Sequence, residues 1–301
     1  MQLHARLFGK FQLLAISPCG LAKVVPLEPG KARELLCFVM LSGNRAHHRE
    51  ALSSLFWGEG SSERSLKYLR QALWQLQSLL GQYSDPEQPV LTVENDWVQL
   101  NSAANLWIDT GAFEASCSQV RNQSGSEFSP EQAKLVQEAA VLYTTDLLEG
   151  WHQDWCLTER ERLQNLYLST LDKLMDYCET HSDFENGLDY GARILAIDKA
   201  RECTHQRLMR LHYLAGNRTA ALRQYNRCSQ ALREELNVQP SKKTQRILEL
   251  IQSDDPEHVQ VTATRTPSPG GWSQLLGELE QLHVLMREIQ GQIEMVRASG
   301  S

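Results

Sequence analysis

The chain has 301 residues, 42% of them hydrophobic, which is enough for two domains with cores of their own. It carries 30 Lys and Arg residues against 37 Asp and Glu residues, for a formal net charge of −7. This balance argues against a protein that binds nucleic acid over its whole surface. Any such contact has to come from a local patch, and residues 1–105, with ten basic and nine acidic residues, are the least acidic third.

The cysteine pattern and the N-terminus both point to the cytoplasm. Seven Cys residues are scattered without a CxxC pair, which predicts reduced structural thiols. Met1 leads directly into a segment of mixed polar and apolar residues, so we expect no signal peptide. No apolar run reaches the length of about 18 residues that a membrane helix needs.

Residues 1–105 mix short strands with three helices. Apolar residues that recur every three or four positions predict helices, and turn residues such as Pro18 and Gly20 separate the strands. Asn95 and Asp96 mark the turn of a closing hairpin. The expected strands are 3–16 and 23–27, the helices 30–43, 48–60 and 62–81, and the hairpin 89–100. This order predicts a winged helix-turn-helix, an α+β fold.

Residues 106–252 are expected to be helical throughout and contain a repeat. The segment 174–191 aligns with 208–225 at an offset of 34 residues, with Leu-Met pairs at the start of both. Thirty-four residues is the period of tetratricopeptide (TPR) helix pairs, which stack into surfaces that bind peptides or other domains. We therefore predict an all-α, TPR-like domain and a mostly α chain.

The remaining residues divide into a linker and a helix. Residues 253–271 are polar and rich in Pro and Gly, which predicts a disordered linker. In 272–298, apolar residues alternate at spacings of four and three, which predicts a coiled coil that joins chains, most simply as a dimer. A helix that folds back on its own chain is the alternative. The seam consists of Leu275, Leu279, Leu282, Met286, Ile289, Ile293 and Val296.

Several motifs together resemble a known family. The stretches LFGKFQL, KARELLCFVML, REALSSLFWGE and LRQALWQLQSLLG resemble, in this order, the DNA-binding domain of the SARP-type antibiotic-pathway regulators. LWIDTGAFEAS, LYTTDLLEGW and the segment 208–244 look like the bacterial transcriptional activator domain that follows it. The resemblance covers roughly residues 3–252 and implies a DNA-binding transcriptional regulator. There is no phosphate-binding loop, so the ATPase module of larger family members is not expected.

The third helix, 62–81, departs from the family pattern. The family typically carries Arg-Leu-Arg where this chain has Gln75-Leu76-Gln77. Helical geometry places one leucine face toward the core, at Leu66, Leu69, Leu73, Leu76 and Leu80. The opposite face and its flanks supply the candidate DNA contacts, with Arg suited to guanine or phosphate and Gln to adenine. These candidates are Arg64, Lys67, Tyr68, Arg70, Gln71, Trp74 and Gln75.

Two features of this region leave alternatives open. Trp74 either packs under the wing or is exposed toward a protein partner or a thymine methyl group. The predicted wing tip has Glu94 and Asp96 but no Lys or Arg, which counts against strong DNA binding.

Other polar groups are interpreted structurally. His47 and His48 are expected at a helix start, Cys178 and His181 as core plus loop, and His205 and His212 on the surface. Residues 159–162 are interpreted as a solvated charged face. No catalytic grouping, metal site or cofactor site stands out, so we do not expect an enzyme.

The sequence thus favours a cytoplasmic transcriptional regulator that docks a winged helix on double-stranded promoter DNA. Its TPR-like domain would receive a signal or contact RNA polymerase or another regulator, and its C-terminal coiled coil would mediate self-association. The alternative is a non-catalytic scaffold whose winged helix and TPR-like domain bind proteins; the acidic wing tip and Gln75-Leu76-Gln77 favour it.

Overall fold

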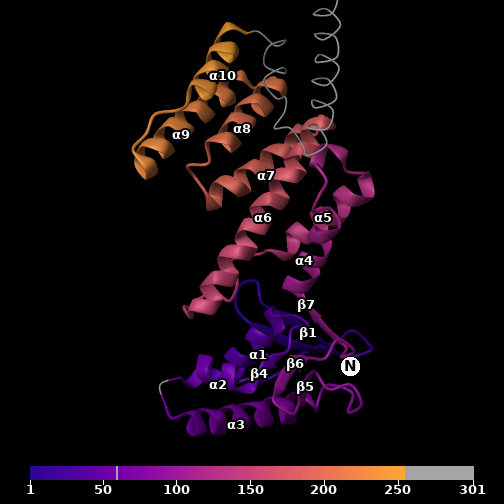
Figure 1. Cartoon of the computed structure of the whole chain (residues 1–301). Helices are drawn as coiled ribbons and strands as arrows, with labels where there is room; N and C mark the ends of the chain where they lie inside the picture. The colour runs from indigo at the N-terminus through magenta and orange to yellow at the C-terminus, as the bar shows by residue number, and fades with distance from the viewer. Residues whose placement is uncertain (59, 255–301) are drawn as a thin grey trace, which may run out of the picture. The chain divides into compact units, whose positions relative to one another are not determined.

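The computed structural model of the chain describes residues 1–58 and 60–254 (Figure 1). They fall into two compact units, Met1–Ile194 and the part of the chain from Leu195 onward, which are described separately. The predicted linker beyond Asp254 and the predicted coiled coil 272–298 lie outside the described residues. Within the described residues, no helix is long and apolar enough to cross a membrane.

A four-stranded sheet opens unit 1. Its order is β3-β2-β1-β7, with β1 and β7 parallel and the other pairs antiparallel. Alternating Leu3, Ala5, Leu13 and Ala15 are buried on one face. Residues 106–108, expected to be helical, instead complete this sheet as β7, because Leu3–Ala5 offers an edge for parallel pairing. The strands are β1 Gln2–Arg6, β2 Gln12–Ile16, β3 Ala22–Val24 and β7 Leu106–Ile108.

Three helices and a small second sheet follow, as the sequence predicts. In the second sheet, of order β4-β6-β5, the β5–β6 hairpin turns at Asn95, whose φ of 50° lies in the left-handed region that Asn tolerates. The predicted winged helix-turn-helix architecture is confirmed. The helices are α1 Lys31–Leu41, α2 Arg49–Trp57 and α3 Ser62–Leu80; the strands are β4 His47–His48, β5 Leu91–Glu94 and β6 Trp97–Leu100.

The rest of unit 1 is helical around an aromatic core. Tyr143 and Tyr167 stack with ring centroids 4.1 Å apart, and Phe8 from the β1–β2 connection packs 4.7 Å from Tyr143. Phe113 lies edge-on to Phe8 at 5.6 Å. One cluster therefore joins the first sheet to the helices, which are α4 Asp109–Gln119, the 3-10 helix η1 Gly125–Glu127, α5 Pro130–Leu142, α6 Asp154–Thr180 and α7 Phe184–Ile197.

Asp109 fastens α4 to the start of the chain. Its carboxylate is buried and accepts hydrogen bonds from the backbone N–H groups of Leu7 at 2.9 Å, Phe8 at 3.0 Å and Thr110 at 2.7 Å. Burial raises the pKa of Asp109, and these backbone donors oppose the rise.

Three helices make up the described part of unit 2: α8 Glu202–Leu214, α9 Arg218–Leu236 and α10 Lys242–Ser253. Their core consists of Met209, Ala221, Ile247, Leu250 and Ile251. The predicted repeat corresponds to two helix pairs, since 174–191 spans the end of α6 and the start of α7, and 208–225 spans α8 and α9. The predicted fold class is confirmed for the described residues.

Candidate nucleic-acid interface

The turn between α2 and α3 is fixed by a buried serine. The Ser65 hydroxyl lies 2.6 Å from the carbonyl oxygen of Trp57, the last residue of α2, and donates to it. Ser65 is 3% exposed, and neighbouring Leu69 and Leu73 are buried against the other helices. This contact ties the first turns of α3 to the end of α2, and the leucine pattern does not reveal it.

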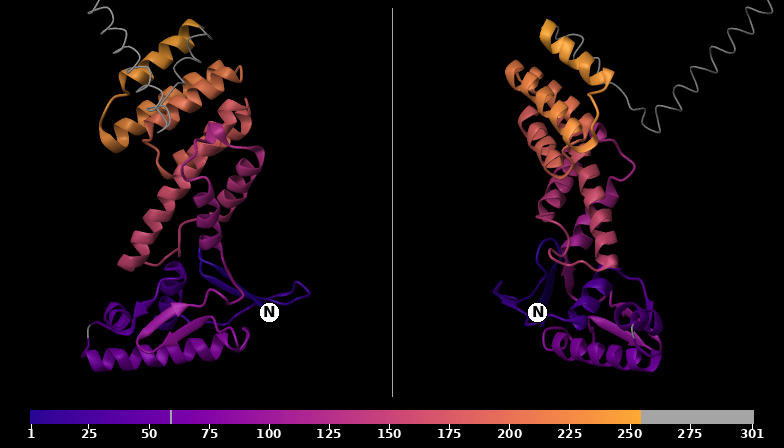
Figure 2. Two further views of the ribbon diagram at one scale, coloured as in Figure 1. Left: turned by 45° about the vertical axis from the view of Figure 1, so that its right-hand side comes forward. Right: turned by 90° about the vertical axis from the view of Figure 1, so that its left-hand side faces the viewer.

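The α3 helix presents its predicted outer face to solvent. Leu69, Leu73, Leu76 and Leu80 are buried as predicted, and Leu66 is half-buried. All seven predicted contact residues are exposed, and Trp74 is 69% exposed, which excludes packing under the wing. In the views of Figures 1 and 2, α3 forms the edge of unit 1 remote from α4–α6, so no element of that unit covers this face.

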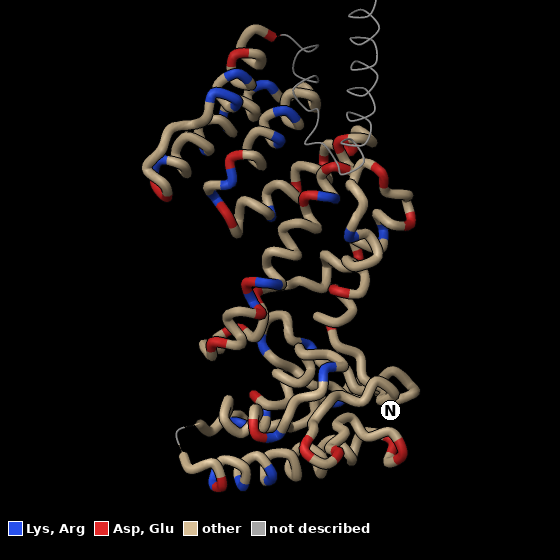
Figure 3. The backbone as a smooth tube through the Cα atoms, in the orientation of Figure 1, with Lys and Arg blue, Asp and Glu red and all other residues tan. Residues whose placement is uncertain are grey.

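The cations of α3 lie in its first half. Arg64, Lys67 and Arg70 account for the blue segments on this helix in Figure 3, and its second half has none. Among the residues that the structure describes, none of the three forms an ion pair. Their charges are therefore available to an anionic partner.

The wing has a basic residue at its tip that sequence periodicity does not reveal. Arg49, the first residue of α2, donates its backbone N–H to the Asp96 carbonyl at 2.8 Å and its guanidinium to the Asn95 carbonyl at 3.4 Å. The two-residue strand β4 makes this possible by pairing His47–His48 with Val98 and Trp97 of β6. A strand of two residues leaves no periodic signal, so only the position of Arg49 directly after the histidines hinted at it.

The wing also exposes an aromatic ring. Trp97 is 50% exposed and lies edge-on to His48, with ring centroids 5.3 Å apart. Glu94 and Asp96 are exposed at the tip, as the sequence predicts. The wing tip therefore combines one cation, Arg49, with the acidic groups of Glu94 and Asp96.

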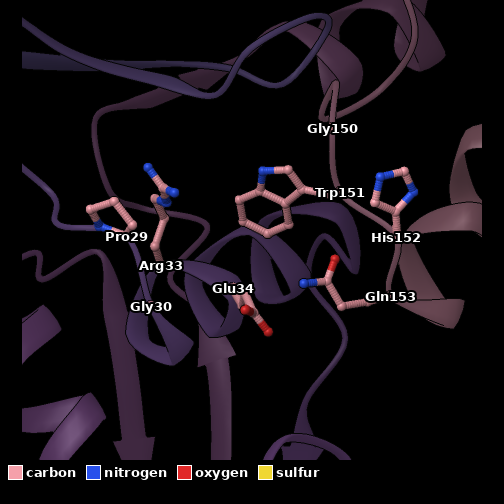
Figure 4. A pocket seen from close by; sticks show the side chains of 8 residues that line it. All are labelled: Pro29, Gly30, Arg33, Glu34, Gly150, Trp151, His152 and Gln153. Carbon is pink, nitrogen blue, oxygen red and sulfur yellow. The ribbon is translucent and has the colours of Figure 1, made fainter.

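A cavity of about 440 Å³ lies beside the start of α1 (Figure 4). The guanidinium carbon of Arg33 sits 5.6 Å from the centre of the Trp151 ring, and Gln153 and Glu34 line the space below them. No group of three or more His, Cys, Asp or Glu residues suited to a metal ion occurs in residues 1–58 and 60–254. The cavity therefore combines an arginine–aromatic pair with polar walls and no metal-ligand set.

Two interpretations of polar residues were wrong. His205 is buried rather than on the surface, because Gln224 donates to its Nδ1 at 2.8 Å and its Nε2–H donates to the Lys199 carbonyl at 2.9 Å. Burial lowers the pKa of His205. Arg160 is not simply solvated, since its guanidinium donates to the carbonyls of Leu147 and Leu148, both at 2.9 Å, and closes the loop before α6.

His48, Cys178 and His181 lie as the sequence predicts, whereas His212 is half-buried and His47 belongs to strand β4. His48 caps α2 by accepting from the Glu50 N–H at 3.4 Å. Cys178 is fully buried in α6, while His181 follows the end of that helix and is exposed.

Comparison with known proteins identifies the helical region. Residues 108–252 match the family described as "Bacterial transcriptional activator domain". The chain carries a bacterial transcriptional activator domain. The match covers α4 to α10 almost to the last residue, and with the winged helix before it the predicted resemblance to SARP-type transcriptional regulators is confirmed.

A solved structure shares the fold. Mycobacterium tuberculosis EmbR, determined in complex with a low affinity phosphopeptide, superposes with a TM-score of 0.61 at 18% sequence identity, over 87% of this chain and 69% of EmbR. At this identity the likeness concerns the fold alone. A search of curated protein sequences gave no significant match.

Proposed function

We propose that this transcriptional regulator binds double-stranded promoter DNA with α3, and that its activator domain contacts RNA polymerase or another regulator. The observation that carries the proposal is the α3 surface, where Arg64, Lys67 and Arg70 are exposed and unpaired among the described residues on the second helix of a helix-turn-helix. In this motif the first turns of the second helix meet base edges. Gln71 and Gln75, exposed beside these cations, are suited to adenine.

The charges limit the strength of this contact. Three phosphates neutralised per chain would give a salt dependence of log affinity with a slope of about −3. Arg49 at the wing tip would add one more cation, while Glu94 and Asp96 would repel phosphate. We therefore expect modest affinity at physiological salt from a single winged helix.

Selection of bound fragments from sheared genomic DNA tests the proposal. The purified full chain should enrich a small set of sequences that share a motif, and footprinting should show protection of one major-groove face there. Enrichment of no motif over input DNA would contradict sequence-specific binding.

Exposed aromatic residues favour a second candidate function, a scaffold that binds proteins. Trp74 on α3 and Trp97 on the wing are 69% and 50% exposed, and large apolar side chains are typical of protein-binding surfaces. The substitution Trp74→Ala separates the two functions. A DNA-binding helix should lose less affinity for the selected sequence with Trp74→Ala than with Lys67→Ala and Arg70→Ala together, whereas a protein-binding surface that uses Trp74 would lose its partner with Trp74→Ala.

We also propose self-association through residues 272–298, on the heptad spacing of the sequence alone. Two linked winged helices would bind paired sites more tightly than one, by roughly 10²–10⁴-fold. Sedimentation of the full chain and of a chain that ends at residue 271 tests this. A monomeric full chain would contradict it.

A further inference from the structure

The described part of unit 2 carries an excess of positive charge. Residues 195–254 hold eleven Lys and Arg residues and six Asp and Glu residues, in a chain whose net charge is −7. Figure 3 shows the blue segments gathered along α8, α9 and α10. Some of these cations are structural: the Arg218 guanidinium, for example, donates to the Ile251 and Gln252 carbonyls at 2.8 and 2.7 Å and closes the end of α10.

Others have no such role. Arg223 and Arg227 are one helical turn apart on α9, and both are exposed. They lie opposite the core face of this helix, which presents Ala221, Cys228 and Leu232 to the interior. Among the described residues neither arginine forms an ion pair, and the hydrogen bond from Arg227 to the Gln224 amide oxygen is long at 3.4 Å.

The first turn of α10 continues this pattern. Lys242 and Lys243 are exposed and form no ion pair within the described residues. Unpaired cations repel one another, so a fold gains nothing from gathering them. A polyanion would turn that repulsion into attraction by binding across several of them, with release of its counterions.

We propose that the exposed cations of α9 and α10 form a second contact with DNA, to the phosphate backbone and without sequence preference. This inference rests on the proposed function, which supplies duplex DNA as the polyanion. A second contact would also supply the phosphate interactions that α3, with only three cations, lacks. Phosphate contacts dominate affinity, while base contacts give specificity. The chain would thus read sequence with α3 and gain affinity with unit 2.

The test is a titration of the full chain against two fluorescent duplexes, one with a selected site and one with that site scrambled, in 50 and 200 mM salt. Arg223→Gln with Arg227→Gln should weaken binding to both duplexes by about tenfold or more at the lower salt and reduce the salt slope by about two. The matched control is Arg121→Gln with Lys134→Gln, which removes the same charge from exposed positions of unit 1 and should change both affinities by less than about twofold. Circular dichroism should show the same helix content for both variants.

The outcomes separate this proposal from the DNA-reading role of α3. Equal effects of the α9 variant and the control would overturn the second contact. An α9 variant that binds both duplexes normally, yet no longer captures an acidic protein that the wild type captures, would overturn it in favour of a protein partner. If no sequence is ever selected but the α9 variant still loses affinity for arbitrary duplex, α3 reading fails and the second contact stands. A wild-type chain that binds neither duplex overturns both.

Discussion

The two helix pairs related by the 34-residue offset have similar cores and different surfaces. Met175 and Met209 correspond in this alignment and are both fully buried, as are Ile194 and Cys228. At an exposed position the charge reverses, since Asp189 of the first pair corresponds to Arg223 of the second. The difference extends beyond the repeat: residues 108–194 hold six basic and sixteen acidic residues, whereas 195–254 hold eleven and six.

The two helix pairs of one domain therefore present different surfaces. The buried positions keep apolar character because packing requires it, whereas the exposed positions are free to change with the partner. Arg193 of the first pair also differs from Arg227, its counterpart. The Arg193 guanidinium donates to the Tyr167 hydroxyl and the Ala140 carbonyl and so belongs to the fold, whereas Arg227 is exposed and makes only a long hydrogen bond to Gln224 on its own helix.

The largest expected effects come from the matched methionines. Met209→Ala should lower the free energy of unfolding by about 3 kcal/mol, because a fully buried side chain leaves a cavity. Hydrogen exchange should then rise mainly in α8–α10. Met175→Ala, its counterpart, should raise exchange mainly in α4–α7. If either variant raises hydrogen exchange equally in α4–α7 and in α8–α10, the two helix pairs unfold as one cooperative unit. They could then not be treated as separate surfaces on separate cores.

Asp109→Asn should weaken the hydrogen bonds that join α4, at the start of the acidic residues 108–194, to the backbone after β1. One carboxylate oxygen that accepts backbone N–H groups would be replaced by an NH₂ group that cannot, at a cost of about 2 kcal/mol in the free energy of unfolding. Thermal denaturation measures the change. The control Glu161→Gln is at an exposed position and should cost less than about 0.5 kcal/mol. An Asp109→Asn protein as stable as wild type would show that these hydrogen bonds are replaced by solvent.

A fall in pH should destabilise the second helix pair, α8 and α9, more than the first pair, α6 and α7. His205 corresponds to Leu171, so only the second pair has a titratable group at this buried position. Burial lowers the pKa of His205, so the unfolded chain takes up a proton first as the pH falls below about 6.5, and the folded state loses stability there. The loss between pH 7 and pH 5.5 should be roughly 1 kcal/mol.

His205→Gln isolates this effect. Glutamine can replace one of the two hydrogen bonds but does not titrate, so the variant should be less stable at pH 7 and its stability should depend less on pH. His212 also has a pKa lowered by burial and remains in both proteins. The same pH slope with and without His205 would assign the acid sensitivity elsewhere.

The sequence predicts the helices of this protein better than its polar interior. Leucines at spacings of three and four revealed the buried face of α3 because that spacing follows directly from helical geometry. It could not place Leu106–Ile108 in the first sheet, since a parallel partner about a hundred residues away leaves no local signal. For the same reason the carbonyl contacts of Arg160 and the burial of His205 were missed, because both depend on partners that only the fold brings close.

The outer face of α3 was predicted residue by residue, and its exposure follows from the same periodicity. What periodicity could not decide was the place of Trp74, because an aromatic residue on the outer face of a helix is compatible with solvent or with cover from a neighbouring hairpin. Arg49 was missed because the strand that brings it to the wing is too short to recognise.

The most direct test of the account is the affinity of Lys67→Ala with Arg70→Ala for a selected duplex, measured beside the wild type. Both side chains are exposed, so the free energy of unfolding should change by less than about 0.5 kcal/mol. The variant should lose its preference for the selected site over scrambled DNA and keep only the weaker binding that depends on α9 and α10. An unchanged preference in a folded variant would contradict the assignment of α3 as the DNA-reading helix.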